Sequence, residues 1–267
     1  MADLKDTDLE DTDLEDTGLK DKVALVTGSS RGIGAAIARE FARHGAKVVV
    51  HGRDTGAMSA VRADIERAGG RAVQVAADIT SFAEIEEMRR RTEAELGPID
   101  ILVANAGGSP IRPGPLEEIT EEGWRASVDG NLTATFLTLK SVLPGMKERG
   151  SGCVITMSSA AARRAHPGSP IAYAAAKAGI ELLTQDVAAQ AGPFGVRANC
   201  IAPETILTEA NQDLIPPAVQ ETLREAHPLR RLGTPEDVAR AAVFLASTDS
   251  AWITGIVIDV AGGAVLV

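Results

Sequence analysis

The feature that most constrains the fold is an alternation of short apolar runs with longer helical stretches, which starts near residue 21 and continues to the C-terminus. The apolar runs are strand-length and rich in β-branched residues: Lys22–Thr27, Lys47–His51, Ala72–Ala76, Asp100–Ala104, Cys153–Met157, Val196–Ala202 and Ile256–Val260. Between them, stretches such as Ala35–Arg43, Glu84–Leu96 and Pro235–Ala246 have apolar residues at helical spacing. Alternating strands and helices are joined by right-handed crossovers. The sequence therefore predicts an α/β fold, a single doubly wound parallel sheet of about seven strands with helices on both faces, in one domain over residues 21–267.

The N-terminal segment differs from the rest in charge. Residues 1–21 hold seven Asp, two Glu and two Lys, whereas the whole chain of 267 residues has a net charge of -10. The segment repeats with a period of five, ending in Leu9, Leu14 and Leu19. This period fits neither helix nor strand, and a highly charged segment with few large apolar residues cannot offset the entropy of ordering. We expect residues 1–20 to form a disordered acidic tail, and a partner-binding role for it stays open.

The composition of the remaining chain excludes several classes of protein. Its acidic and basic residues nearly balance, so it lacks the basic surface that nucleic acids require. No apolar run approaches the roughly 20 residues needed to cross a bilayer. The acidic N-terminus is unlike a secretory signal peptide, and both cysteines, Cys153 and Cys200, lie in expected strands. We expect a cytoplasmic protein with reduced thiols, without nucleic-acid or membrane partners and without a metal site.

A glycine-rich turn follows the first expected strand and opens the first expected helix. Its glycines, Gly28, Gly32 and Gly34, have the spacing Gly-x3-Gly-x-Gly. Such a turn lets backbone amides approach a pyrophosphate at the positive end of a helix. Taken alone, an ordinary strand-to-helix turn is the alternative. The candidate dinucleotide-binding residues of this turn are Gly28, Ser30, Arg31, Gly32, Ile33 and Gly34.

The end of the second expected strand bears on the choice between the two nicotinamide cofactors. An acidic residue there binds the adenosine ribose, whereas an arginine accommodates a 2′-phosphate. His51 and Gly52 are followed by Arg53, and Arg31 lies in the glycine turn. Because guanidinium groups bind phosphate bidentately, we predict NADP(H). Asp54 is the alternative ribose ligand, although its position also fits the N-cap of the next helix.

Tyr173 and Lys177 lie one helical turn apart with three alanines between them. Their i, i+4 spacing places both side chains on one helical face. Tyr173 is the only tyrosine in the chain. Together with the glycine turn, this pair resembles the short-chain dehydrogenase/reductase family, whose fold is Rossmann-like, and the resemblance extends from Leu19 to the C-terminus.

The resemblance implies further cofactor contacts in chain order. Asp78 and Ile79 would lie near the adenine, and Tyr173 and Lys177 near the nicotinamide ribose. The other implied contacts are Asn105, Ala106 and Gly107 after the fourth strand, and Pro203, Ile206 and Thr208 near the nicotinamide carboxamide.

The resemblance also implies a catalytic tetrad of Asn131, Ser159, Tyr173 and Lys177. Tyr173 would supply a proton to the oxygen on which charge grows as hydride reaches a carbonyl carbon. Lys177 would lower the phenol pKa from about 10, Ser159 would orient the substrate, and Asn131 would hold a water. Ser159 stands one residue farther from the tyrosine than is usual. Ser158, the other serine at the end of the fifth expected strand, is the alternative.

The family relationship closest to this chain is with 3-oxoacyl-acyl-carrier-protein reductases. It implies an oxidoreductase that transfers hydride between NADP(H) and a carbonyl or secondary alcohol, and it implies a homotetramer. Residues 204–229 would cover the site and, being partly apolar, fit a 3-oxoacyl thioester or another apolar ketone. An NAD-dependent secondary-alcohol dehydrogenase and a non-catalytic dinucleotide-binding regulator are the alternatives.

Charged residues near the expected substrate mouth leave two questions. Arg163, Arg164 and His166 lie between the candidate serine and the tyrosine, where they would offer positive charge to an anionic substrate. Exposed loop cations commonly contribute nothing. Glu204 replaces the family's usual glycine and would either repel acidic substrates or point outward.

Overall fold

The computed structural model describes residues 17–209, 211–212 and 215–265. Within these residues, seven parallel strands form one sheet in the order β3-β2-β1-β4-β5-β6-β7. The strands are β1 (Val23–Val26), β2 (Lys47–Gly52), β3 (Arg71–Ala76), β4 (Ile101–Ala104), β5 (Gly152–Met157), β6 (Val196–Pro203) and β7 (Val257–Val260). Each lies within a residue or two of an expected run, so the predicted fold class is confirmed.

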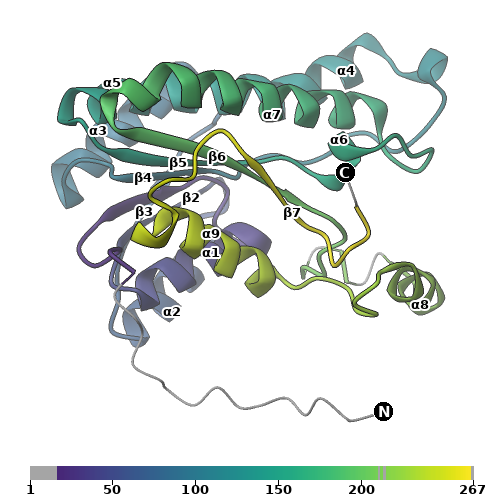
Figure 1. Cartoon of the computed structure of the whole chain (residues 1–267), viewed down its shortest axis with the longest axis horizontal. Coiled ribbons are helices and arrows are strands. Elements are labelled where there is room, and N and C mark those ends of the chain that lie inside the picture. The colour runs from purple at the N-terminus through teal and green to yellow at the C-terminus, as the bar shows by residue number, and fades with distance from the viewer. Residues whose placement is uncertain (1–16, 210, 213–214, 266–267) are drawn as a thin grey trace.

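Helices cover both faces of the sheet (Figure 1). The helices are α1 (Gly32–Arg43), α2 (Thr55–Arg67), α3 (Phe82–Leu96), α4 (Glu121–Val128), α5 (Ala134–Arg149), α6 (Ala160–Arg163), α7 (Ile171–Ala191), α8 (Pro217–Ala226) and α9 (Pro235–Ala246). Helices α1, α2 and α9 lie on one face and α3, α4, α5 and α7 on the other, while α8 stands beyond the end of the sheet. Among the described residues, no helix is both long and apolar enough to cross a membrane.

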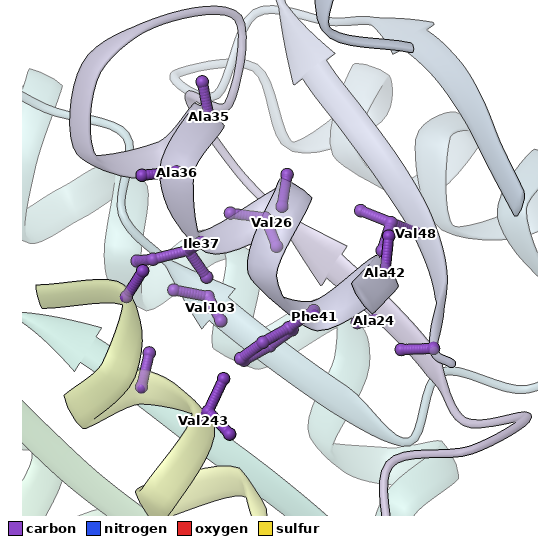
Figure 2. Packing of buried hydrophobic residues seen from close by; sticks show 14 of the residues in the cluster. Ala24, Val26, Ala35, Ala36, Ile37, Phe41, Ala42, Val48, Val103 and Val243 are labelled. Carbon is purple, nitrogen blue, oxygen red and sulfur yellow. The ribbon is translucent and has the colours of Figure 1, made fainter. Parts of the chain in front are cut away.

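The core between α1, α9 and the sheet shows why the strands are almost wholly apolar. Figure 2 shows Ile37 and Phe41 of α1 beside Val26, Val103 and Val243. The side chain of Phe41 is fully buried. Because helices cover both faces, every residue of β1 and β4 is buried, and neither strand alternates between apolar and polar.

The body of the protein begins earlier than the predicted tail boundary at residue 20. Leu19 is fully buried in the core, and the carbonyl oxygen of Thr17 accepts a hydrogen bond of 3.2 Å from the amide of Thr248. The boundary was misplaced because one leucine of the repeat packs against the sheet although its neighbours are charged. Residues 1–16 lie outside the described part, so the disordered tail stays a prediction there.

Local capping explains where the helices nearest the site begin. The Asp54 carboxylate accepts a hydrogen bond from the amide of Ala57 at 3.0 Å and caps α2. Helix α9 has the expected bounds because Thr234 and Asp237 form a reciprocal capping box.

Candidate active site

The carboxyl ends of the strands open into a cavity of about 1090 Å³. It lies where the chain order of the sheet reverses between β1 and β4, which is the ligand-binding position of doubly wound folds. Nearly all the expected site residues line it: Gly28, Ser30, Arg31, Ile33, Gly34, Arg53, Asp78, Ile79, Asn105, Ala106, Gly107, Ser159, Tyr173, Lys177, Pro203, Ile206 and Thr208. Gly32 and Asn131 do not appear in its lining.

The glycine turn packs its backbone tightly against the end of β4. A Cβ on Gly28, whose φ is +66°, would lie 2.8 Å from the Cα of Ala106. A Cβ on Gly34 would lie 2.4 Å from the carbonyl oxygen of Gly28. The hydroxyl of Thr27 accepts hydrogen bonds of 3.1 Å from the amides of Asn105 and Ala106. The turn therefore presents bare backbone to the cavity, as a pyrophosphate requires.

The first amide of α1 already binds an anionic group of this chain. The backbone N–H of Gly32 donates a hydrogen bond of 3.2 Å to the carboxylate of Glu209. This contact shows that the helix start can hold an oxyanion, so the turn fits a dinucleotide phosphate. The sequence analysis did not identify Glu209, although it directly follows Thr208, an expected cofactor contact.

His51 supports the glycine turn from β2. Its Nδ1 lies 3.0 Å from the amide of Gly28 and its Nε2 lies 3.1 Å from the carbonyl oxygen of Ala77. The amide donates and the carbonyl accepts, so Nε2 carries the proton of a neutral ring. Burial lowers the pKa of His51, which favours this neutral form. The sequence analysis considered His51 only as a non-acidic residue.

Asp54 is the N-cap of α2, which is the structural role that its sequence position also fitted. It also pairs with Arg31, with 2.7 Å between Oδ2 and Nη2. The hydrogen bond from Ala57, burial and Arg31 set its pKa, with a net lowering. Asp54 still lines the cavity beside Arg53. Arg31 is thus already paired, whereas Arg53 is exposed at the same rim.

Asp78 lines the cavity and is held there by a local turn. Its Oδ1 accepts hydrogen bonds from the amide and the hydroxyl of Thr80, at 2.9 Å and 2.8 Å. These hydrogen bonds lower the Asp78 pKa, and the charge of Arg53 adds to the effect. The carboxylate is therefore ionised and fixed in direction.

Tyr173 and Lys177 project from α7 toward the cavity, as their spacing predicts. Nζ of Lys177 lies 5.4 Å from the centroid of the Tyr173 ring. Burial raises the Tyr173 pKa, and a hydrogen bond with Ser159 lowers it in part. Burial also lowers the pKa of Lys177 to about 8. Burial thus outweighs the hydrogen bond with Ser159, and the net direction is a raised phenol pKa; the lowering expected from Lys177 stays a prediction to be tested by titration.

The two candidate serines face different ways. Ser159 caps the short helix α6, its hydroxyl accepting a hydrogen bond of 3.2 Å from the amide of Ala161, and it contacts Tyr173. Ser158 is buried, and its hydroxyl donates to Glu181 at 2.7 Å. The geometry therefore brings Ser159, and not the hydroxyl of Ser158, to the phenol.

Asn131 lies behind the loop that follows β4. It lies in a π-helical turn, Asp129–Thr133, and is fully buried. Its Nδ2 donates to the carbonyl oxygens of Gly108 and Ser127, both at 2.8 Å, and its Oδ1 accepts from the amide of Gly108 at 3.1 Å. Both N–H groups are used in these contacts, so the side chain fixes the loop after β4, and the expected role in holding a water stays a prediction.

Comparison with known proteins agrees with this geometry. The family model described as Enoyl-(Acyl carrier protein) reductase matches residues 28–265. 3-oxoacyl-(acyl-carrier-protein) reductase FabG of Chlamydia muridarum is 38% identical over 244 residues, covering 91% of this chain and 97% of the relative. Human dehydrogenase/reductase SDR family member 4 is 39% identical over 248 residues, covering 91% and 87%. A solved 7 alpha-hydroxysteroid dehydrogenase, complexed with NADH and 7-oxo glycochenodeoxycholic acid, superposes with a TM-score of 0.87 at 36% identity, covering 92% and 94%.

The chain belongs to the short-chain dehydrogenase/reductase family. It is therefore an oxidoreductase of that family, and the expected relationship is confirmed.

Arg163 does not offer its charge to a substrate in this family member. Its Nη1 pairs with Glu181 at 3.0 Å and its Nε with Asp259 at 3.0 Å. The sequence analysis missed both carboxylates because they come from distant elements, α7 and β7. Arg164 and His166, by contrast, are exposed in the loop before α7.

Glu204 neither lies free at the substrate mouth nor points outward. Its Oε2 lies 2.8 Å from Nε2 of His227, which follows the last turn of α8 and is buried. Nδ1 of His227 lies 2.6 Å from the carbonyl oxygen of Leu223 and must donate its proton there. The departure from the family's glycine thus links the end of β6 to α8. Residues 210, 213 and 214 of the expected covering segment lie outside the described part.

Proposed function

We propose that this short-chain dehydrogenase/reductase transfers hydride between NADP(H) and the carbonyl or secondary alcohol of a small molecule. The observation that carries the proposal is the meeting of Ser159 and Tyr173 at one end of a cavity whose other end is bordered by Arg31 and Arg53. A proton donor and a phosphate-binding rim are the two features that such a reaction requires.

The chain's own residues account for the proton transfer and for orientation. A bound nicotinamide would supply or accept the hydride. Ser159 hydrogen-bonds the substrate oxygen and orients it toward Tyr173. The raised pKa of Tyr173 keeps the phenol protonated at neutral pH, so it donates a proton to the oxygen during reduction. Lys177, on the same helical face, would hold the nicotinamide ribose.

NADP(H) is proposed over NAD(H) because Arg53 is exposed at the rim and no carboxylate occupies positions 51 and 52. One observation favours NAD(H) as a second candidate. Arg31 is paired with Asp54, which leaves only part of its guanidinium for a 2′-phosphate. A related structure also holds NADH.

An apolar ketone or a 3-oxoacyl thioester is the proposed substrate class. Met157, Ile206 and Ile215 give the cavity apolar lining. Arg163 is neutralised by two carboxylates, so it does not select an anion. The relatives that act on a hydroxysteroid and on a 3-oxoacyl group support a bulky, largely apolar substrate.

A cytoplasmic homotetramer is the proposed assembly. Phe136 of α5 and Leu182 of α7 are 47% and 61% exposed, and Trp252, before β7, is 100% exposed. Large apolar side chains on an outer helical layer and beside an edge strand fit two protein interfaces. Light scattering of the full chain tests the assembly, and a monomer would contradict it.

The decisive experiment compares NADPH and NADH consumption with a panel of ketones, 3-oxoacyl thioesters and quinones. We expect reduction of at least one apolar ketone or thioester, with NADPH preferred. A preference for NADH would support the second candidate, a dehydrogenase/reductase that uses NAD(H). Binding of a dinucleotide without turnover on any of these carbonyls would instead support a non-catalytic regulator.

A further inference from the structure

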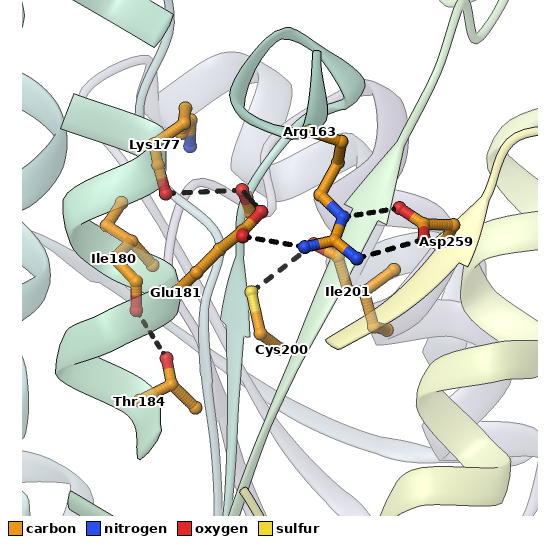
Figure 3. A network of polar contacts seen from close by, with 9 residues as sticks. Arg163, Lys177, Ile180, Glu181, Thr184, Cys200, Ile201 and Asp259 are labelled. Atoms are coloured by element: carbon orange, nitrogen blue, oxygen red, sulfur yellow. Dashed lines mark hydrogen bonds and ion pairs between the residues drawn. The ribbon is translucent and has the colours of Figure 1, made fainter. Parts of the chain in front are cut away.

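A partly buried ionic cluster lies beside the candidate catalytic residues. Figure 3 shows Arg163 between the carboxylates of Glu181 and Asp259. The three side chains are 21%, 13% and 20% exposed, respectively, so water screens them weakly. One arginine thus joins the end of α6, the middle of α7 and β7. The proposed hydride transfer does not use any of these groups directly.

Glu181 also reaches the residue next to the candidate serine. One of its carboxylate oxygens accepts the Ser158 hydroxyl at 2.7 Å while the other faces Arg163 at 3.0 Å. The Ser158 hydroxyl lies 3.2 Å from the carbonyl oxygen of Lys177 as well. Ser158 is therefore fixed to the same turn of α7 that carries Lys177.

These contacts hold Ser159 from both sides along the chain. Ser158 precedes it, and Arg163 ends the single helical turn that Ser159 caps. Both flanking contacts lead to Glu181, which lies two helical turns after Tyr173 on the same face of α7. The segment that carries Ser159 is thus linked through Glu181 to α7, the helix that carries Tyr173.

We propose that Glu181 is a positioning residue that, through Ser158 and Arg163, fixes the hydroxyl of Ser159 against the phenol of Tyr173. The proposal rests on the proposed function for its kinetic consequence but not for its geometric one. Hydroxyl placement matters because displacement of a reacting group by about 1 Å can cost on the order of 100-fold in rate.

The single tyrosine provides a readout that does not depend on turnover. Tyrosine labelled with 13C at Cζ gives one resonance, from Tyr173, whose shift follows ionisation of the phenol. Glu181→Gln removes a negative charge, which by Coulomb's law alone would lower the Tyr173 pKa. Loss of the Ser159 hydrogen bond would raise it, because that bond lowers the pKa now. The direction of the change therefore separates positioning from simple electrostatics.

A second cluster in the chain provides a matched control. Glu86 accepts a hydrogen bond from Ser141 and pairs with Arg89, which also pairs with Glu93 at 2.6 Å. This cluster joins α3 and α5 and lies outside the cavity lining. Glu86→Gln thus breaks the same kind of serine–glutamate–arginine network away from the site.

We expect Glu181→Gln to raise the Tyr173 pKa and to lower kcat about tenfold with little change in dinucleotide affinity. Glu86→Gln should alter neither the Tyr173 pKa nor kcat. Ser158→Ala, which leaves the ion pairs intact, should move the Tyr173 pKa in the same direction and remains informative if Glu181→Gln does not fold. An unchanged or lowered Tyr173 pKa in the folded variants would overturn the proposal. If the wild type reduces no carbonyl, the proposed function fails while the titration still decides the role of Glu181.

Discussion

Nζ of Lys177 donates a hydrogen bond of 2.8 Å to the carbonyl oxygen of Met157, the last residue of β5. The ammonium group is therefore tied to the strand end beneath the cavity, although its helix also carries Tyr173. Burial of this group lowers its pKa from 10.5 to about 8. The proposed function needs the Lys177 ammonium group at this site. Its burial is costly, so we expect it to lower the free energy of unfolding.

Lys177→Met should stabilise the fold at neutral pH and abolish carbonyl reduction. A folded-state pKa of about 8 against 10.5 means that the unfolded chain binds more protons between these pH values. The lysine therefore destabilises the fold below pH 8, and this destabilisation disappears as the pH rises toward 10.5. The lowered pKa corresponds to a cost of on the order of 3 kcal/mol for burying the charged lysine. The variant relieves this cost but also loses the hydrogen bond to Met157, which offsets about 1 kcal/mol of the gain.

Urea unfolding at pH 7 and pH 10 measures this effect. The stability gained by the variant over the wild type should shrink at the higher pH, because pH 10 lies close to the unfolded-state pKa of 10.5, so removing the proton on folding costs much less there than at pH 7. A variant that is less stable than the wild type at both values would contradict the assigned burial cost.

Tyr173 should titrate above the usual phenol pKa of about 10 in the absence of dinucleotide, because burial disfavours phenolate. Ultraviolet absorbance reports this residue alone, since the chain has no other tyrosine and tryptophan does not ionise in this range. Tyr173→Phe supplies the blank for the titration. A midpoint clearly below 10 would show that Lys177 outweighs burial.

Tyr173→Phe should also reduce turnover by about 100-fold or more, the usual contribution of a positioned proton donor. Dinucleotide affinity should change only a few-fold, because the expected phosphate contacts and the expected ribose contact of Lys177 remain. Steady-state kinetics and nicotinamide fluorescence measure the two quantities separately. Near-normal turnover in the variant would exclude the phenol as the donor.

Arg53→Ala should weaken NADPH binding by about 1.5–3 kcal/mol, the contribution of a hydrogen bond to a charged group. NADH binding should barely change, because it lacks the 2′-phosphate. Arg62→Ala is a suitable control, since Arg62 lies on α2 and pairs with Glu66 outside the cavity. Direct titration with both dinucleotides measures the effect, and equal losses for NADPH and NADH would assign Arg53 a role other than phosphate binding.

Residue order along the chain was enough to predict the sheet and most of the cavity, because both depend on local patterns. The strands are apolar runs, and the glycine turn follows β1 directly. The Tyr173–Lys177 pair needs only helical periodicity. The same periodicity extends to Glu181, one turn after Lys177. The sequence could therefore have placed Glu181 on the face of α7 that carries Tyr173 and Lys177.

Contacts between distant elements could not be predicted in this way. Asp259 reaches Arg163 only because β7 adds to the sheet beside β6. His51 and Asn131 each satisfy backbone groups of loops that the sequence does not bring near them. The sign of the Tyr173 pKa shift likewise depends on burial, which a motif does not report.

The pairing of Glu204 with His227 predicts a role in holding α8 at the end of β6. Glu204→Gln should weaken the link by about 1.5–3 kcal/mol, because a charge-assisted hydrogen bond of a buried imidazole becomes a neutral one. Hydrogen exchange of the α8 amides should then accelerate by about tenfold or more, and KM for a bulky ketone should rise more than kcat falls. Glu225→Gln, on an exposed residue of the same helix, is the matched control. Unchanged exchange in α8 after Glu204→Gln would show that the packing of His227, and not its contact with Glu204, holds the helix in place.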